Sequence, residues 1–486
     1  MTASKALSTE QLINELQTRG VRLEDAGHGA PSRRGGAGPS DHKALSIDGR
    51  VVMIPVHTAG ADQSPYSLGT AGDDGGAALS REGREIARLA FTPTPRFYDL
   101  RTDDGVPYSH IATLHGKDVL ATTVLQTCIR YNNRKVSCQF CAIEQSLKEG
   151  RTIAHKTPAQ LAEVARAAVA LDGVKHMVMT TGTPNLRDRG ARILCDSAAA
   201  VTTAVDLPIQ AQCEPPDDPA WFRRLRDSGV ASLGMHLEIA TPALREKIMP
   251  SKASVSLEQY MDAFAEAVAV FGRGQVSTYL LAGLGDTPET TLALCRRLID
   301  LGVYPFVVPF VPISGTPLAN HPSPSSAHMA SILKPLAGML RDGDLRSRDI
   351  KAGCGRCGAC SSLSTFEDAS DQVPADLESL SWSWNRSPRS APGSTPSKWR
   401  TRPGSSAPPP RCAAACSARS RGCSRTTTGT PWTNTPPSWW RSPTWRAART
   451  RWSARCASTA TGPASGTAPG WRWRRATGAT PIWAAR

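Results

Sequence analysis

Between residues 119 and 350, short apolar runs alternate with longer amphipathic stretches, and this alternation constrains the fold more than any other feature. Six segments have the length and composition of buried strands: Val119–Leu125, Lys175–Thr180, Leu207–Gln212, Ala231–Ile239, Gln275–Ala282 and Tyr304–Val311. Five have the pattern of helices: Thr157–Leu171, Asp188–Val205, Asp218–Ser228, Leu257–Phe271 and Pro288–Leu301. Repeated strand–helix units predict a parallel sheet. We therefore expect an α/β fold, namely a partial (β/α)6 TIM-type barrel, with a doubly wound sheet as the alternative. In both, the reactive loops lie at the carboxyl ends of the strands.

The segments before and after this region divide the rest of the chain. Residues 1–115 form an N-terminal extension, 116–350 the barrel, 351–371 a cysteine-rich segment and 372–486 a tail. In the extension, Ser8 and Gln11 predict the capped start of a helix that ends near Gly20. We also expect a turn and a strand over Ser46–His57 and a helix over Ser80–Leu89.

The tail differs sharply in composition from everything before it. From Ser381 onward it carries 17 Arg and one Lys with no acidic residue, so it accounts for all of the chain's net charge of +15. It also holds 11 of the 12 Trp but no Leu, Val, Phe, Met or Tyr. Such a segment cannot bury an aliphatic core, which predicts disorder. The composition resembles an out-of-frame reading of GC-rich DNA, and we hypothesise a change of frame near residues 371–380.

Three cysteines follow the first predicted strand in a single loop. Cys128, Cys138 and Cys141 have the spacing C-x9-C-x2-C. Three thiolates can ligate three irons of a [4Fe–4S] cluster and leave the fourth iron open to a cofactor. The alternatives are zinc, with a fourth ligand from His155 or the later cysteines, and burial in the core. Clustered cysteines in a reducing compartment favour a metal.

The segments TCIRYNNRKVSCQFCAIEQS and GCGRCGACSSL, with the order of the later strand ends, resemble the radical SAM superfamily, in its branch near biotin synthase and the hydrogenase-maturation proteins. More narrowly, they resemble a bacterial radical SAM family found in gene clusters with a nitrilase. That family has C-x3-C-x2-C, whereas the first gap here is nine residues. The resemblance implies a [4Fe–4S] cluster that cleaves S-adenosylmethionine to a 5′-deoxyadenosyl radical, which abstracts hydrogen from a small substrate.

The same resemblance implies roles for residues at the strand ends. Phe140 would lie beside the adenine, Glu238 would accept a hydrogen bond from the ribose, and His236 would be a weaker neighbour. Thr181, Gly182 and Thr183 would offer backbone carbonyls to the methionine ammonium. Gly283, in LLAGLGD, would allow the backbone to approach the adenosine. For each, a packing or turn role is the alternative.

Two further groups of polar and cysteine side chains are candidates. Gln212 and Glu214 alternate with Cys213 and become substrate contacts if they face the lumen of the barrel. Cys354, Cys357 and Cys360 form C-x2-C-x2-C among glycines that permit tight turns around a metal. We expect an auxiliary iron–sulfur cluster there, with zinc or a non-metal role as alternatives.

The expected partners are a small-molecule substrate and an electron donor of the flavodoxin or ferredoxin type. Neither a secretory signal nor a run of about 20 apolar residues is found, so we expect a cytoplasmic protein that does not enter the membrane. The Arg- and Trp-containing tail could contact phosphates and bases, but nucleic acid is the less favoured partner. The competing class is a non-catalytic, zinc-binding or nucleic-acid-associated protein.

Overall fold

The computed structural model describes residues 7–24, 41–73 and 75–371. They belong to one compact unit, Met1–Asn385, and a second unit, Arg386–Arg486, lies wholly outside the described residues. The predicted disorder of 372–486 and the hypothesised change of frame also lie outside them. The four domain boundaries given above stay predictions.

The larger of two sheets has seven strands in the order β13-β12-β11-β10-β9-β8-β7. Every pair from β8 to β13 is parallel, and only β7 runs antiparallel to its neighbour. The strands are β7 (Thr113–His115), β8 (Val119–Thr123), β9 (His176–Thr180), β10 (Ile209–Gln212), β11 (Val230–Gly234), β12 (Val276–Ala282) and β13 (Val303–Pro309). A doubly wound sheet would reverse its strand order at a switch point, and this sequential order has none. The prediction of a mixed α/β fold is confirmed.

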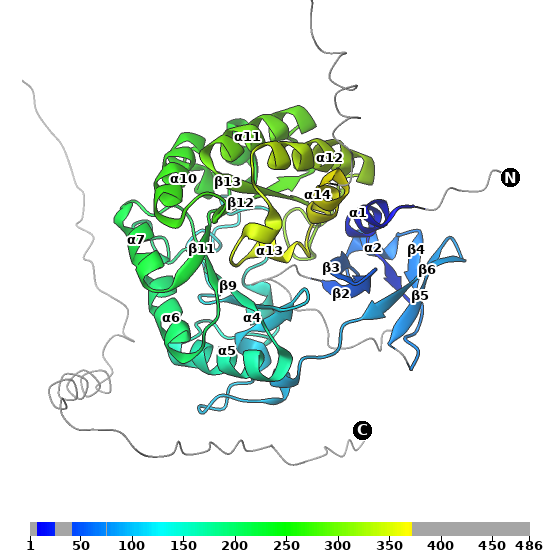
Figure 1. Ribbon diagram of the computed structural model, residues 1–486, viewed down its shortest axis with the longest axis horizontal. Coiled ribbons are helices and arrows are strands. Elements are labelled where there is room, and N and C mark those ends of the chain that lie inside the picture. Colours follow the sequence, from blue (N-terminus) through cyan, green and yellow to red (C-terminus); the bar gives the residue numbers. More distant parts are fainter. Residues whose placement is uncertain (1–6, 25–40, 74, 372–486) are drawn as a thin grey trace, which may run out of the picture. The chain divides into compact units, whose positions relative to one another are not determined.

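Helices cover the outer face of this curled sheet (Figure 1). They are α5 (Pro158–Asp172), α6 (Ala191–Ala204), α7 (Ala220–Asp227), α10 (Leu257–Phe271), α11 (Pro288–Leu301) and α12 (Ser326–Asp342). Helix α5 starts at a capping box, in which Gln160 N donates to Thr157 Oγ1, and Pro158 occupies its first position as predicted. Helix α12 was not predicted, because Pro335 lies inside it.

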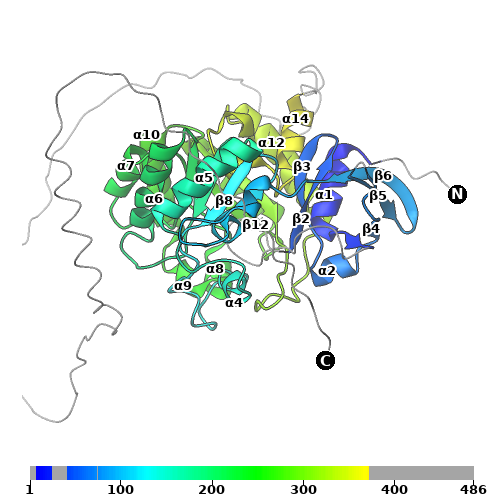
Figure 2. The ribbon, with the colours of Figure 1, turned by 90° about the horizontal axis from the view of Figure 1, so that it is seen from below.

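Shorter elements lie in the connections. They are η1 (Arg96–Asp99), α3 (Tyr108–Ile111), α4 (Gln145–Lys148), α8 (Pro242–Ile248), α9 (Pro250–Ala253) and η2 (Ser347–Asp349). Helices α4, α8 and α9 all follow the carboxyl ends of strands, and Figure 2 shows them on the same side of the unit. This end of the sheet therefore carries the longest loops.

The fourth predicted strand is shorter than expected, and this corrects the range Ala231–Ile239. Strand β11 ends at Gly234, Met235 N and Leu237 N still donate hydrogen bonds to Ser277 O and Thr278 Oγ1 of β12, and Glu238 forms a bridge with Leu280. Between them, His236 Nδ1 accepts a hydrogen bond from Tyr279 N at 3.2 Å, in place of a backbone carbonyl. Glu238 itself has a left-handed φ of 60°. A local bulge thus turns the Glu238 carboxylate out of the regular strand pattern.

The N-terminal extension forms a second, six-stranded sheet in the order β1-β4-β5-β6-β2-β3. Its strands are β1 (Arg22–Leu23), β2 (His42–Ile47), β3 (Arg50–Pro55), β4 (Tyr66–Leu68), β5 (Gly76–Arg81) and β6 (Arg84–Phe91), packed with α1 (Thr9–Arg19) and α2 (Ala59–Asp62). The capped helix predicted after Ser8 is confirmed. The helix predicted over Ser80–Leu89 is wrong: Arg81 pairs with Arg84, and Glu82 and Gly83 both have positive φ. That two-residue turn closes a β-hairpin.

The extension packs against the cysteine-rich segment, which forms α13 (Cys354–Cys357) and α14 (Leu363–Asp371). The carbonyl of Ala359 accepts hydrogen bonds from Met53 N at 2.8 Å and from Gln17 Nε2 at 3.0 Å. Asn14 Nδ2 donates to Ser326 O at 2.8 Å at the start of α12. Figure 1 shows α13 on the concave side of the curled sheet, facing β2 and β3. None of the described helices is both long and apolar enough to cross a bilayer.

Candidate cofactor and metal site

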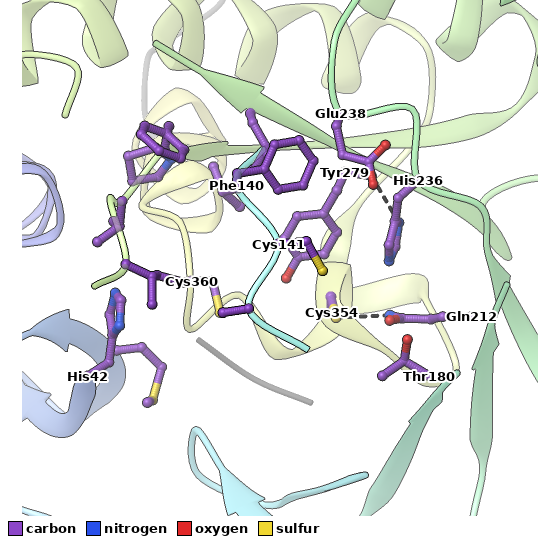
Figure 3. A pocket seen from close by; sticks show the side chains of 18 of the residues that line it. His42, Phe140, Cys141, Thr180, Gln212, His236, Glu238, Tyr279, Cys354 and Cys360 are labelled. Carbon is purple, nitrogen blue, oxygen red and sulfur yellow. Dashed lines mark hydrogen bonds between the residues drawn. The ribbon is translucent and has the colours of Figure 1, made fainter. Parts of the chain in front are cut away.

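Two adjoining cavities lie inside the curled sheet. The smaller has a volume of about 210 Å³ and the larger about 400 Å³. They share Cys141, Phe140, Gln212, His236 and Glu238, which contribute to the walls of both. Figure 3 shows Phe140, Cys141, Tyr279 and Cys354 around the same space. Residues from the ends of different parallel strands therefore converge here, as expected for such a sheet.

Cys128, Cys138 and Cys141 all line the smaller cavity as free thiols. Their loop is pressed against the segment after β9, because Gly182 N donates to Leu125 O and Ile129 N donates to Thr183 O. A Cβ at Gly182 would lie 2.0 Å from the carbonyl oxygen of Thr127, so only glycine fits at this position. The predicted cysteine group is thus brought together beside the predicted Thr181–Gly182–Thr183 segment.

Two buried ion pairs border the three cysteines. Arg130 donates to both carboxylate oxygens of Glu214, at 2.8 and 2.9 Å, and also to Ser251. Lys252 Nζ lies 2.6 Å from Glu238 Oε1 and 2.8 Å from Oε2. Burial alone would lower the pKa of Lys252, but the charge of Glu238 outweighs it and leaves that pKa raised. Burial opposes ionisation of Glu214 too, but the charges of Lys252 and Arg130 leave its pKa lowered. For Glu238, burial outweighs the charge and hydrogen bonds of Lys252 and leaves the pKa of its carboxyl raised.

The other predicted cofactor residues are placed as follows. Thr181, Gly182 and Thr183 line the smaller cavity, and Thr183 Oγ1 donates to Glu214 at 2.5 Å. Phe140 and Glu238 line both cavities, and Glu238 reaches them already paired with Lys252. Gly283 is not among the described residues that line either cavity. Its φ of 104° and its contact with Pro324 explain the glycine locally, and its approach to adenosine stays a prediction.

The second cysteine group lies across the larger cavity from the first. Cys354 and Cys360 line this cavity, and Gln212 Nε2 donates to Cys354 Sγ at 3.2 Å (Figure 3). The side chain of Tyr279 hydrogen-bonds to the thiols of Cys354 and Cys360. Gly353, with φ of 116°, packs its Cα against Gln210, where a Cβ would lie 2.2 Å from the amide group. The turn into α13 therefore requires glycine.

Burial controls the protonation of these thiols. It raises the pKa of Cys141 to about 11 and of Cys357 to about 12, and it raises the pKa values of Cys138, Cys354 and Cys360 as well. The thiols therefore keep their protons until a metal displaces them. In the described part of the chain, no three Cys, His, Asp or Glu side chains converge as ligands of one metal ion. The assignment of these thiols to an iron–sulfur cluster or to zinc stays a prediction.

Several residues of the site were not identified from the sequence. Arg130 and Lys252 lie in segments that read as loop, and only their partners at strand ends were singled out. Tyr279 lies within β12, where an aromatic residue is an ordinary strand former. His115 lies in β7, a three-residue strand too short to show a pattern. In contrast, Gln212 and Glu214 line the smaller cavity, but so does Cys213, because β10 ends at Gln212 and the strand alternation does not continue beyond it.

Comparison with known proteins gives the family of the central segment. Residues 132–298, which include Cys138 and Cys141, match the Radical SAM superfamily. The probable dual-specificity RNA methyltransferase RlmN of Moorella thermoacetica is 27% identical over 139 residues, covering 28% of this chain and 39% of that protein. Bacteriochlorophyllide c C-7(1)-hydroxylase of Chlorobaculum limnaeum is 25% identical over 214 residues, covering 40% of this chain and 53% of that protein. The chain thus spans only about two fifths to half of these relatives.

Among solved structures, the crystal structure of methylornithine synthase (PylB) superposes with a TM-score of 0.38 at 18% identity, covering 50% of this chain and 67% of that one. The sequence match, not this superposition, identifies the domain. Residues 132–298 of this chain are thus similar to the radical SAM superfamily, whose members are enzymes that use a [4Fe–4S] cluster and S-adenosylmethionine.

Proposed function

We propose that this chain is a radical SAM enzyme in which Cys128, Cys138 and Cys141 ligate the [4Fe–4S] cluster. The observation that carries this proposal is the convergence of the three thiols on one cavity at the strand ends of a radical SAM domain. The bound cluster and S-adenosylmethionine would supply a 5′-deoxyadenosyl radical that abstracts hydrogen from the substrate. An external donor of the flavodoxin or ferredoxin type would supply the electron.

The walls of the smaller cavity would bind the parts of S-adenosylmethionine. Phe140 would pack against the adenine, and the backbone carbonyls of Thr181, Gly182 and Thr183 would accept hydrogen bonds from the methionine ammonium. The Glu238 side chain would accept a hydrogen bond from a ribose hydroxyl, and its contact with Lys252 would orient it. Gly283 would remain near the adenosine as an element of the fifth strand end.

The larger cavity would hold a small, mostly apolar substrate. Its walls include Val178, Leu281 and Phe310, while Gln212 and Tyr279 offer hydrogen bonds. Its volume of about 400 Å³ is that of an ordinary small-molecule pocket. An RNA substrate is the alternative, because four relatives are named as RNA methyltransferases. The apolar walls favour the small molecule, since a nucleic-acid phosphate calls for Arg or Lys contacts.

Within the superfamily we propose the branch near biotin synthase, and more narrowly the family encoded beside a nitrilase. The support is the sequence of the two cysteine segments. A nitrilase gene beside the gene of this chain would direct the substrate search toward nitriles and amides. A neighbourhood of RNA-modifying enzymes would direct it toward RNA instead.

The test is anaerobic reconstitution of the full chain with iron and sulfide, followed by S-adenosylmethionine and dithionite. We expect a brown protein that releases 5′-deoxyadenosine. A Cys128→Ala, Cys138→Ala and Cys141→Ala triple variant should release none. Cys195→Ala, in helix α6, is the matched control and should behave as wild type. A colourless protein loaded with zinc, or a triple variant as active as wild type, would refute the proposal.

A further inference from the structure

The imidazole of His115 contacts the sulfur of Cys360, and the proposed function assigns no role to this contact. Its Nε2 lies 3.3 Å from Cys360 Sγ, and both side chains line the larger cavity. His115 is 8% exposed and belongs to β7, the antiparallel edge strand of the large sheet. Cys360 follows α13, 245 residues later in the chain. Folding therefore adds a nitrogen donor to a group of three thiols.

The two atoms are within hydrogen-bonding distance, and their separation is also close to that of two ligands on one metal atom. Metal–sulfur bonds of about 2.3 Å and metal–nitrogen bonds of about 2.1 Å place such a pair about 3.5 Å apart in tetrahedral geometry. The ligands of a cubane lie on different irons and are farther apart than this. In the described part of the chain, no three such side chains are gathered around the position of a single ion. A cluster with two irons would use His115 and Cys360 as one pair of ligands and draw the other pair from Cys354 and Cys357.

The protein around the four donors is rigid and supplies hydrogen bonds to the sulfurs. Gln212 donates to Cys354, and Ala359 is fixed by Gln17 and Met53 from the N-terminal sheet. Cys357 packs against Gly116, the residue after His115, where a Cβ would lie 2.9 Å from its sulfur. Such outer contacts orient ligands and tune clusters. The N-terminal extension thus holds the loop that carries Cys360 against β7.

We propose that His115 is the fourth protein ligand of an auxiliary [2Fe–2S] cluster, with His115 and Cys360 on one iron and Cys354 and Cys357 on the other. The proposal rests on the proposed function only in taking these three cysteines as iron–sulfur ligands. His115, Cys360 and Cys141 all line the larger cavity, so a cluster held by His115 and Cys360 would border the same cavity as the first cluster. The substrate would therefore bind between two iron–sulfur clusters.

The experiment isolates the auxiliary cluster in the full chain. The Cys128→Ala, Cys138→Ala and Cys141→Ala triple variant removes the first cluster, and roughly two irons per chain should remain after reconstitution. In its dithionite-reduced form, pulsed EPR should detect a strongly coupled ¹⁴N nucleus. His115→Cys in that background should keep the iron but lose the nitrogen coupling, because a thiolate replaces the imidazole. His115→Ala should lose both the coupling and part of the iron.

His176→Gln is the matched control. His176 lies beside the same segment, but its Nδ1 accepts a hydrogen bond from Gly353 N. This variant should keep both the iron and the coupling. The proposal is overturned by an iron-free or zinc-loaded triple variant, by four irons in place of two, by the absence of nitrogen coupling, or by a coupling that persists in His115→Cys. Release of 5′-deoxyadenosine by the wild-type chain is scored separately, so failure of the His115 assignment leaves the proposed function standing.

Discussion

The ion pair between Arg130 and Glu214 connects the cysteine loop to the end of β10, and its removal should be costly. The two side chains are 6% and 8% exposed, and two of the hydrogen bonds to Glu214 come from Arg130. Arg130→Met would leave the buried Glu214 with the hydrogen bond from Thr183 and the charge of Lys252, which lowers its pKa more than the charge of Arg130 does. Breaking one side of a buried pair costs about 3–5 kcal/mol. Because Thr183 and Lys252 still interact with Glu214, we expect Arg130→Met to lower the free energy of unfolding by about 3 kcal/mol, the lower end of this range.

The assay is guanidinium denaturation of the metal-free full chain, followed by circular dichroism, so that loss of the cluster does not enter the result. Arg297→Met is the matched control, because the pair of Arg297 and Glu258 has a similar length of 3.0 Å but is exposed. We expect Arg297→Met to lower the free energy of unfolding by less than about 1 kcal/mol. An Arg130→Met and Glu214→Leu double variant should recover most of the loss, since no buried charge is left unpaired.

The dependence on pH gives a second readout of the same pair. The pKa of Glu214 is lowered in the folded protein, so its contribution is present above its ordinary pKa and is lost as the pH falls through the lowered value. The deficit of Arg130→Met should therefore shrink in acid. The reasoning would be refuted if the free energy of unfolding of Arg130→Met lay within about 0.5 kcal/mol of wild type at neutral pH. It would also be refuted if the loss in the double variant equalled the sum of the losses in the two single variants.

Three further perturbations test other parts of the site. Burial lowers the pKa of His236 to about 3, so on acidification the unfolded chain binds a proton before the folded one does. The free energy of unfolding should therefore fall between about pH 6.5 and 3, and His236→Gln should reduce this pH dependence in acid titrations. Gly182→Ala should bring a Cβ against the Thr127 carbonyl and lower the iron retained by the first cluster, whereas Gly60→Ala, with open space around it, should retain wild-type iron. Tyr279→Phe removes a hydrogen bond to the cysteine sulfurs and should lower the reduction potential of the auxiliary cluster in a redox titration, while unchanged potential would count against that contact.

Local signals predicted the elements wherever neighbouring residues alone decide the conformation. Thr157 with Pro158 fixes the start of α5, and the apolar runs that became β9 and β12 are buried as expected. The hairpin over residues 76–91 was missed because charged residues dominate Arg81–Arg88, and pairing with distant strands outweighed their helix propensity.

The sequence by itself determined that strands and helices alternate, that three cysteines follow the first barrel strand, and that a second group follows the barrel. These are properties of residues close together in the chain. Only the tertiary structure decided that Cys141 and Cys354 face one cavity, that Arg130 and Lys252 neutralise the two buried carboxylates, and that His115 meets Cys360. The physical reason is that the curl of a parallel sheet brings distant strand ends together, and no local pattern records which side chains then meet.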